Sequence, residues 1–375
     1  MFLGAVLPVC AQENFLVAGT VLERSISGGK TDLFKVTLDK GDFVHVLVEQ
    51  KGVDVEVALI SPTGEQIARM DSPNSEWGPE PLASIAATAG EYKVRVTSSG
   101  PPGSTGKVAI SMVAHHPAST SDSQQVAAER AIEKAYDLGV QQTPEALENS
   151  VSKLQEALRY YDGSPDRYRR GIVLLSIGLA RAQENRFGDA INYYKRSASI
   201  FESLADKHMQ ATSINNIAGC LDFLGDYPEA LKLYAQALSL LQGSEERYTQ
   251  AAILNNVGKI HTDTGDWEQA AHFYEQALAL ARAAGDKPLL ANTLHNSGNN
   301  NLELGQPETA LPYFQEELSV ARAIGDKLRQ SRALDSMGWA YSAQGDAVKA
   351  MDSYQQALIF QTQKSDKRRE ALTLR

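Results

Sequence analysis

Residues 258–274 read GKIHTDTGDWEQAAHFY, and this stretch decides the fold because its spacing returns along the chain every 40 residues. Ala270 and Tyr274 are four residues apart, which places both side chains on one face of a helix. Gly265 supplies the left-handed conformation in which helices commonly end. The stretch therefore predicts the end of one helix, a tight turn and the start of a second helix.

The pattern recurs in register in five consecutive units. The small residue of the first helix and the alanine of the second let the two helix backbones approach, and we expect the aromatic to fill the space against the next hairpin. An acid followed by a base, as in Asp286-Lys287, recurs at the same interval, and the acid favours the start of a helix. The register positions are Gly178, Ala218, Gly258, Gly298 and Gly338, then Ala190, Ala230, Ala270, Ala310 and Ala350, then Tyr194, Tyr234, Tyr274, Phe314 and Tyr354.

This order of residues resembles the tetratricopeptide repeat, which implies an all-α solenoid, a right-handed superhelix of helical hairpins. Residues 166–365 would form five such repeats of 40 residues. Residues 126–165 are predicted to form a degenerate capping hairpin, with Thr143 as an N-cap. Residues 366–375 would begin a truncated sixth repeat, so we expect the natural array to continue or another domain to follow.

Residues 15–112 have a different texture, in which apolar and polar side chains alternate in short runs between Gly, Pro, Asn and Asp. This alternation is typical of antiparallel strands and predicts a β-sandwich. Residues 113–125 are rich in Ser, Thr and Ala and are predicted to be a linker. The runs with the clearest alternation are residues 32–38, 43–48, 53–60 and 91–96.

The strand segment resembles the pre-peptidase C-terminal family of bacterial secreted β-sandwich domains. The resemblance rests on Asp32-x-Phe34-x-Val36, the turn Lys40-Gly41-Asp42 and Ala89-Gly90-x-Tyr92. It implies a small adhesive or accessory module. A sandwich followed by 40-residue repeats is also similar to the N-terminal part of exported bacterial proteins that end in a caspase-like CHAT peptidase domain. That similarity transfers no enzymatic residue to this chain.

The first residues and the composition bear on location and partners. Residues 1–14 contain an apolar run that ends Val9-Cys10-Ala11, which predicts an export signal and a periplasmic or extracellular protein. No other segment is long and apolar enough to span a bilayer. The net charge of -10 argues against a nucleic acid and favours a basic partner.

Catalytic and metal-binding patterns find no support. The histidines His208, His261 and His295 are scattered over different units, and a Cys–His dyad with Cys220 would require them to converge, so it is not expected. The pair His115-His116 lacks further ligands at fixed spacing. We therefore expect neither an enzyme nor a cofactor. The sandwich segment contains four acids that could bind calcium, but they do not form a run of alternating acidic ligands, so we expect turn or surface roles for them. These acids are Asp32, Asp42, Asp54 and Asp71.

In the last four hairpins the first helix carries a polar pair two and three residues before the register position, whereas the first unit has Leu175-Ser176 there. A ladder of amides can both donate to and accept from the backbone of an extended peptide. The alternative is that one Asn of each pair bonds a neighbouring hairpin. Trp339 is either a binding anchor or a packing residue. The candidate peptide-binding groove consists of Asn215, Asn216, Asn255, Asn256, Lys259, His295, Asn296, Asn299, Arg332, Asp335 and Trp339.

These patterns favour a non-catalytic scaffold that binds a protein or an extended peptide in the groove of the repeats. Two alternatives stay open. The chain is the sensing or regulatory portion of a CHAT-type peptidase whose catalytic domain is absent, or its β-sandwich binds a polysaccharide or a cell surface.

Overall fold

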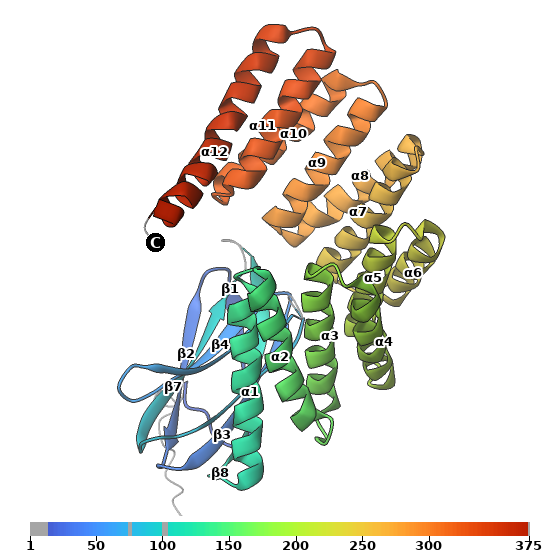
Figure 1. The fold of residues 1–375 in the computed structure, drawn as a ribbon. Coiled ribbons are helices and arrows are strands. Elements are labelled where there is room, and N and C mark those ends of the chain that lie inside the picture. Colours follow the sequence, from blue (N-terminus) through green and yellow to red (C-terminus); the bar gives the residue numbers. More distant parts are fainter. Residues whose placement is uncertain (1–13, 74–76, 100–103, 374–375) are drawn as a thin grey trace, which may run out of the picture. The chain divides into compact units, whose positions relative to one another are not determined.

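The structure of the protein is a computed structural model that describes residues 14–73, 77–99 and 104–373, with side chains up to residue 360. The chain forms two units, residues 1–213 and 214–375 (Figure 1). The predicted export signal at 1–14 lies outside the described residues apart from its last position. In the part of the chain that the structure describes, no helix has the length and apolar character needed to cross a membrane.

The first unit begins with the predicted β-sandwich, made of two antiparallel four-stranded sheets. One sheet has the strand order β1-β8-β3-β6 and the other β2-β7-β4-β5. The four runs singled out by their alternation fall within or overlap β2, β3, β4 and β7. The strands are β1 Val21–Ser27, β2 Thr31–Leu38, β3 Asp42–Lys51, β4 Val55–Ile60, β5 Gln66–Met70, β6 Trp77–Ile85, β7 Gly90–Ser98 and β8 Thr105–Pro117.

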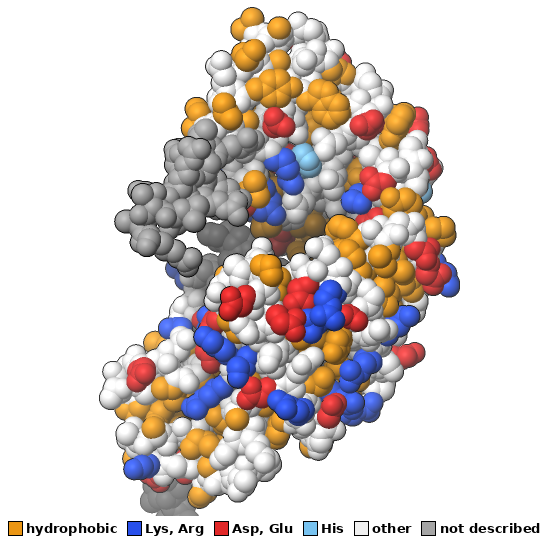
Figure 2. Space-filling view, viewed as in Figure 1, with side chains coloured by type: hydrophobic (Ala, Val, Ile, Leu, Met, Phe, Trp, Pro, Cys, Tyr) orange, Lys and Arg blue, Asp and Glu red, His pale blue; other side chains and the backbone are white. Residues whose placement is uncertain are grey.

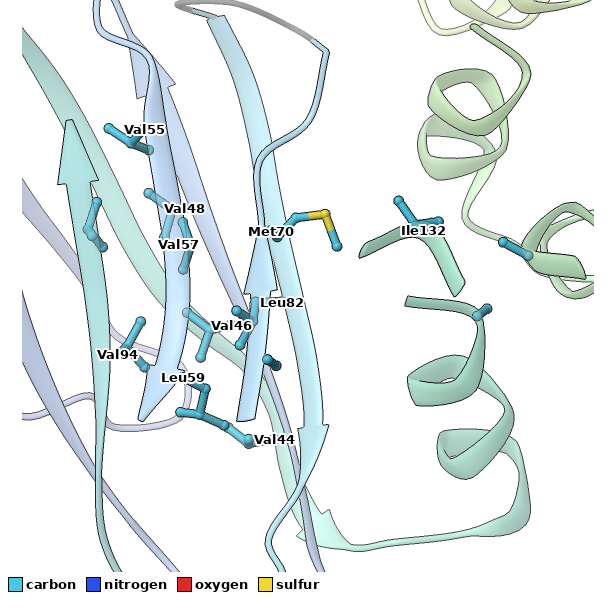
Figure 3. Close-up of a cluster of buried hydrophobic side chains, with 14 of the residues drawn as sticks. Val44, Val46, Val48, Val55, Val57, Leu59, Met70, Leu82, Val94 and Ile132 are labelled. Carbon is cyan, nitrogen blue, oxygen red and sulfur yellow. The ribbon is translucent and has the colours of Figure 1, made fainter. Parts of the chain in front are cut away.

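Alternation along the strands explains the core of the sandwich. Val44, Val46 and Val48 of β3 are fully buried, as are Val55 and Val57 of β4. Figure 3 shows these valines from the two sheets in one cluster, with a helix packed beside it. Two sheets that bury their inner faces in this way are stabilised mainly by the removal of apolar surface from water.

The predicted linker at 113–125 differs from the structure. Strand β8 continues to Pro117, and helix α1 begins at Thr120. The reason is local, because His115 bonds Asp42 within the sheet and Ser119 forms a capping box with Asp122. Helices α1 (Thr120–Gly139) and α2 (Pro144–Tyr161) form the predicted hairpin, and Thr143 caps α2 by accepting the amide of Ala146 at 3.2 Å.

A buried ion cluster joins the sandwich to the first helices of the same unit. Arg169, only 1% exposed, donates to Glu129 of α1 and, at 3.1 Å, to the hydroxyl of Ser72. Tyr161 of α2 also donates to Glu129. One hydrophobic core runs without interruption from the sandwich through these helices. The sandwich and the first hairpins are therefore parts of one packed body.

Glu80 lies fully buried beside this cluster and gives the first unit a pH dependence. Its carboxylate accepts the amide of Ser72 at 2.8 Å, yet desolvation by burial raises the pKa of Glu80 from 4.5 to about 8. Below pH 4.5 the carboxyl is protonated in both states. As the pH rises towards 8 the unfolded chain loses this proton and the folded chain keeps it, so the stability contributed by the neutral carboxyl is progressively lost.

We expect Glu80→Gln to remove this dependence. Between pH 5 and pH 8, the window between the two pKa values, the wild type should lose stability that the variant keeps. The difference in free energy of unfolding, variant minus wild type, should therefore rise by on the order of 2 kcal/mol over this range. Urea unfolding at both pH values measures the difference. Glu65→Gln, in the exposed turn before β5, is the matched control and should leave the difference flat. A flat response of Glu80→Gln itself would show that Glu80 is ionised throughout.

The repeats form the expected hairpins of paired helices. Between the two helices of a hairpin, Gly225, Gly265, Gly305 and Gly345 have positive φ, as a left-handed helix end requires. In the first hairpin Asn185 takes this role. The helices are α3 Arg167–Gln183, α4 Phe187–Ser203, α5 Lys207–Phe223, α6 Tyr227–Leu240, α7 Arg247–Asp263, α8 Trp267–Ala284, α9 Lys287–Glu303, α10 Pro307–Ala323, α11 Lys327–Ala343 and α12 Ala347–Thr373.

The predicted start of a sixth repeat at residue 366 is not a separate helix. Helix α12 runs on to Thr373, so the expected turn before Asp366 is absent from its backbone. Gly285 and Gly325 supply the left-handed residue at the corresponding turns of earlier repeats. Ser365 stands at that position here, and it lacks the conformational freedom of glycine.

The aromatic of four repeats makes a contact that the sequence did not predict. A Cβ added to Gly258 would lie 2.7 Å from the ring of Tyr274, which belongs to the same hairpin. Gly178, Gly298 and Gly338 meet Tyr194, Phe314 and Tyr354 in the same way. The aromatic therefore lies on the glycine of its own hairpin, and Phe314 also shares a buried cluster with Ala340 of the next hairpin, as expected. The absence of a side chain on the first helix makes room for the ring.

Candidate functional site

The candidate groove residues of the second unit share one face of the first helix of each hairpin. On α7, position 259 lies three residues after position 256 and four after position 255, and side chains at these spacings are neighbours on a helix surface. The polar stripe comprises Asn255, Asn256 and Lys259 of α7, His295, Asn296 and Asn299 of α9, and Arg332, Asp335 and Trp339 of α11.

The amide ladder divides into structural and accessible members. Asn296 donates to the side-chain oxygen of Asn255 at 3.0 Å, which links α9 to α7, and Asn255 is buried. Asn256 and Asn296 are partly exposed. The alternative that one Asn of a pair bonds a neighbouring hairpin therefore applies to Asn255 and to its partner Asn296, of which only Asn296 is partly exposed. On α5, Asn215 and Asn216 are partly exposed, and the side-chain oxygen of Asn215 has no hydrogen-bond partner among the described residues.

Lys259 is a charged member of the polar stripe with two acidic neighbours. Its ammonium lies 2.7 Å from Asp263 on the same helix and 3.2 Å from Asp222 of α5. Burial opposes the charge, but the hydrogen bond to Asp263 and the charge of Asp222 outweigh it and raise the pKa of Lys259. The side chain remains 42% exposed, so a ligand can reach it.

A buried carboxylate organises the C-terminal half of the polar stripe. Glu317 of α10 is fully buried and accepts from Arg332 at 2.6 Å. His295 lies 3.1 Å from Glu317 through Nδ1 and 3.0 Å from the amide of Asn299 through Nε2. Both contacts fit the histidine tautomer that carries its proton on Nδ1. Glu317 therefore holds Arg332 and His295 in place, and His295 in turn contacts Asn299.

Glu317 was not among the predicted site residues, although the sequence carries a signal for it. The equivalent positions in the other repeats are Ser197, Ala237, Ala277 and Ala357, all small. An acid at a position that is otherwise small and packed indicates a specific partner, because a buried charge is costly unless it is paired. The register of the repeat could have identified it.

The last part of the polar stripe is open. Trp339 is 53% exposed, and Asp335 is also exposed. Beside them a pocket of about 400 Å³ is lined in part by Leu328, Arg329 and Arg332 of α11. Figure 2 shows acidic, basic and histidine side chains close together on this face, next to hydrophobic ones. An exposed indole beside charged groups is suited to contact a ligand.

Two residues considered for metal binding or catalysis, Asp42 and Cys220, are engaged in the fold itself. Asp42 accepts the amide of Asp39 at 2.9 Å and faces His115 at 2.8 Å. Cys220 is buried in α5, and burial raises the pKa of its thiol to about 11. Within the described residues, no three His, Cys, Asp or Glu side chains are grouped so that they could hold a metal ion.

Comparison with known proteins defines the class and then the family. The stacked hairpins with a small residue, a glycine turn and an aromatic form a helical-repeat solenoid. The sequence model of the tetratricopeptide repeat matches residues 169–243, 209–283, 249–323 and 289–360, which together span just over half of the chain. The chain belongs to the tetratricopeptide repeat family. The match bears on the repeats and not on the sandwich. No curated protein matches the sequence.

Solved structures share the fold at low sequence identity. A signal transduction ATPase with a tetratricopeptide repeat sensor from Pyrococcus horikoshii is 20% identical, with a TM-score of 0.54 over 65% of this chain and 38% of that one. Aspartyl phosphate phosphatase F from Bacillus subtilis is 12% identical, with a TM-score of 0.52 over 64% and 72%. The Rap conjugation gene regulator of plasmid pLS20, in complex with the Phr peptide, is 13% identical, with a TM-score of 0.50 over 65% and 76%.

Proposed function

We propose that the protein is an interaction scaffold that binds an extended peptide or protein segment along the polar stripe of the second unit. The observation that carries the proposal is the arrangement of the stripe: partly exposed amides on α7 and α9 lead to an exposed indole on α11. Amides of this kind hydrogen-bond a peptide backbone, and a large aromatic supplies the anchor. The Rap regulator of similar fold is described in complex with a peptide, which supports the same mode of use.

The charges of the chain favour a basic ligand within the same proposal. The chain has a net charge of -10, and Asp335 is exposed beside Trp339. A cationic segment would be drawn to such a surface and held beside the indole, where the attraction of a cation to an aromatic face adds to binding. The export signal expected at residues 1–14 would place this partner outside the cytoplasm.

Trp339 provides the sharpest test. Random peptides displayed on phage are selected against the full chain, and the dissociation constant of an enriched peptide is measured by fluorescence polarisation. We expect Trp339→Ala to weaken binding roughly 30-fold, the loss typical of a central aromatic anchor. Asn256→Ala and Asn296→Ala should each weaken it by a smaller factor of about five, because one hydrogen bond is lost.

The matched control is Met351→Ala, since Met351 is 59% exposed but lies on α12, a second helix of a hairpin and off the polar stripe. It should bind the peptide like the wild type. Equal affinity of Trp339→Ala and wild type would refute the proposed anchor. Selection that enriches no peptide would refute the groove as a peptide-binding site.

A further inference from the structure

The first unit contains a second site, a pocket of about 680 Å³ between the sandwich and helices α1, α2 and α3. A volume in this range is typical of ligand sites. Arg69 of β5 and the residues just after this strand line one part of the pocket, and α1, α2 and α3 contribute other lining residues. Its lining includes Arg69, Asp71, Glu133, Asp137, Leu154 and Leu179.

The register of the repeat shows why the amide ladder does not reach this pocket. Ser176 and Leu179 of α3 line it, and they occupy the positions of Asn256 and Lys259 in α7. The face that is polar in the second unit is thus largely apolar here. The sandwich covers this part of the face and turns it from an open surface into a walled pocket.

The walls of the pocket are fixed by buried contacts. Ser72, on the sandwich side, accepts from the guanidinium of Arg169 at 3.1 Å and donates its amide to Glu80 at 2.8 Å. On the helix side, Ser150 donates to the carbonyl of Ala135 at 2.8 Å, which ties α2 to α1. The pocket is therefore formed before any ligand arrives, which lowers the entropic cost of binding.

The lining of the pocket carries more acidic than basic side chains. Arg69 is the cation, and it already lies 2.6 Å from Asp137 and 3.7 Å from Glu56. Asp71 and Glu133 add two further carboxyl groups to the same lining. Glu133 is half-buried, and burial raises its pKa. Leu154 and Leu179 contribute apolar side chains to the same lining.

We propose that this pocket binds a cation carried on an aliphatic stem, which is the chemistry of a lysine side chain or of the free amino terminus of a peptide. The stem lies against Leu154 and Leu179, and the cation is held by Asp71 and Glu133. Long cationic side chains commonly bury their stems and place their heads at acceptors in this way. The site is separate from the polar stripe, so the sandwich takes part in ligand recognition.

Ligand-observed NMR with small probes tests the site on the full chain. Nα-acetyl-lysine methylamide represents the side chain, and leucinamide represents the free terminus. Their neutral counterparts are Nα-acetyl-norleucine methylamide and N-acetyl-leucinamide. We expect one cationic probe to bind at least roughly tenfold more tightly than its neutral counterpart, and the probe that binds identifies the source of the cation.

Asp71→Asn combined with Glu133→Gln should reduce this affinity roughly tenfold, because the acceptors lose their charge. The control is Glu145→Gln with Glu156→Gln, which makes the same change of charge on exposed positions of α2. Circular dichroism confirms that both variants fold. Equal binding of cationic and neutral probes, no binding of any probe, or full affinity in the pocket variant would each overturn the proposal. None of these results bears on peptide capture by Trp339, which the polar-stripe variants test on their own.

Discussion

Arg169→Met is expected to lower the free energy of unfolding of the first unit by about 3–5 kcal/mol, the largest effect of any single change considered for this unit. Methionine fills most of the volume of arginine but leaves Glu129 buried without its cation. Glu129 is 5% exposed, so water cannot replace the lost partner. The hydroxyl of Ser72 loses its donor at the same time, which loosens the sandwich from α3.

Tryptophan fluorescence isolates this effect. The chain has three tryptophans, and Trp77 is the one that lies in the first unit. In a background of Trp267→Phe and Trp339→Phe, urea unfolding of Trp77 therefore reports the first unit.

Two comparisons show whether the buried charge is the cause. Adding Glu129→Gln to Arg169→Met removes the unpaired charge while keeping an acceptor for Tyr161, and should restore more than half of the loss. Lys153→Met breaks an ion pair on α2 whose partners are both more than 40% exposed, and should change stability by less than about 0.5 kcal/mol. A loss from Arg169→Met that persists unchanged in the double variant would assign the effect to packing.

The second large effect is expected at the contact between Phe314 and Gly298. Phe314 is fully buried, and its ring occupies the space that a side chain at Gly298 would need. Phe314→Ala should destabilise the second unit by about 3–5 kcal/mol through lost burial and the cavity left behind. Gly298→Val should cost about 1–3 kcal/mol, because the added methyl groups overlap the ring.

The double variant is the decisive measurement. Valine at 298 can enter the space vacated by the ring, so Gly298→Val with Phe314→Ala should lose at least about 1 kcal/mol less than the sum of the single losses. Urea unfolding followed by Trp267 and Trp339, in a Trp77→Phe background, reports the second unit. Strict additivity would mean that the two positions do not share this space.

A second glycine provides the control. Gly219 also lies within a helix, α5, but an added Cβ would meet its nearest neighbour at an ordinary 3.7 Å. Gly219→Ala should therefore raise stability by up to about 1 kcal/mol, since alanine favours the helix. The contrast between Gly219 and Gly298 separates helix propensity from packing against the aromatic.

The sequence predicted the parts of the fold that repeat or alternate. Gly265, Ala270 and Tyr274 identify a hairpin because the turn and the helix face are set by residues close together in the chain. Alternation in β3 likewise identifies a half-buried strand. The linker prediction failed because Ser and Thr near residue 120 were weighed as flexible residues, whereas Ser119 is a helix cap.

The candidate site was predicted only in outline. The register of the repeat placed the polar stripe on one face of α7, α9 and α11, but it could not show which of Asn255 and Asn256 bonds a neighbouring helix. Nor could it show that Glu317 holds Arg332 and His295 in place. These facts depend on the distance between helices, which the spacing within one helix does not contain.

By itself, then, the sequence determined the β-sandwich, the 40-residue hairpins and the face that carries the polar stripe, because short-range spacing fixes turns, caps and helix faces. Only the tertiary structure decided that the sandwich and α1 to α3 share one core and enclose a pocket. The contact between Arg169 and Ser72, which fixes Ser72 in the lining of this pocket, joins residues 97 positions apart. No local pattern records such a pairing, because it arises only when the sheet and the helices bury their apolar faces against each other.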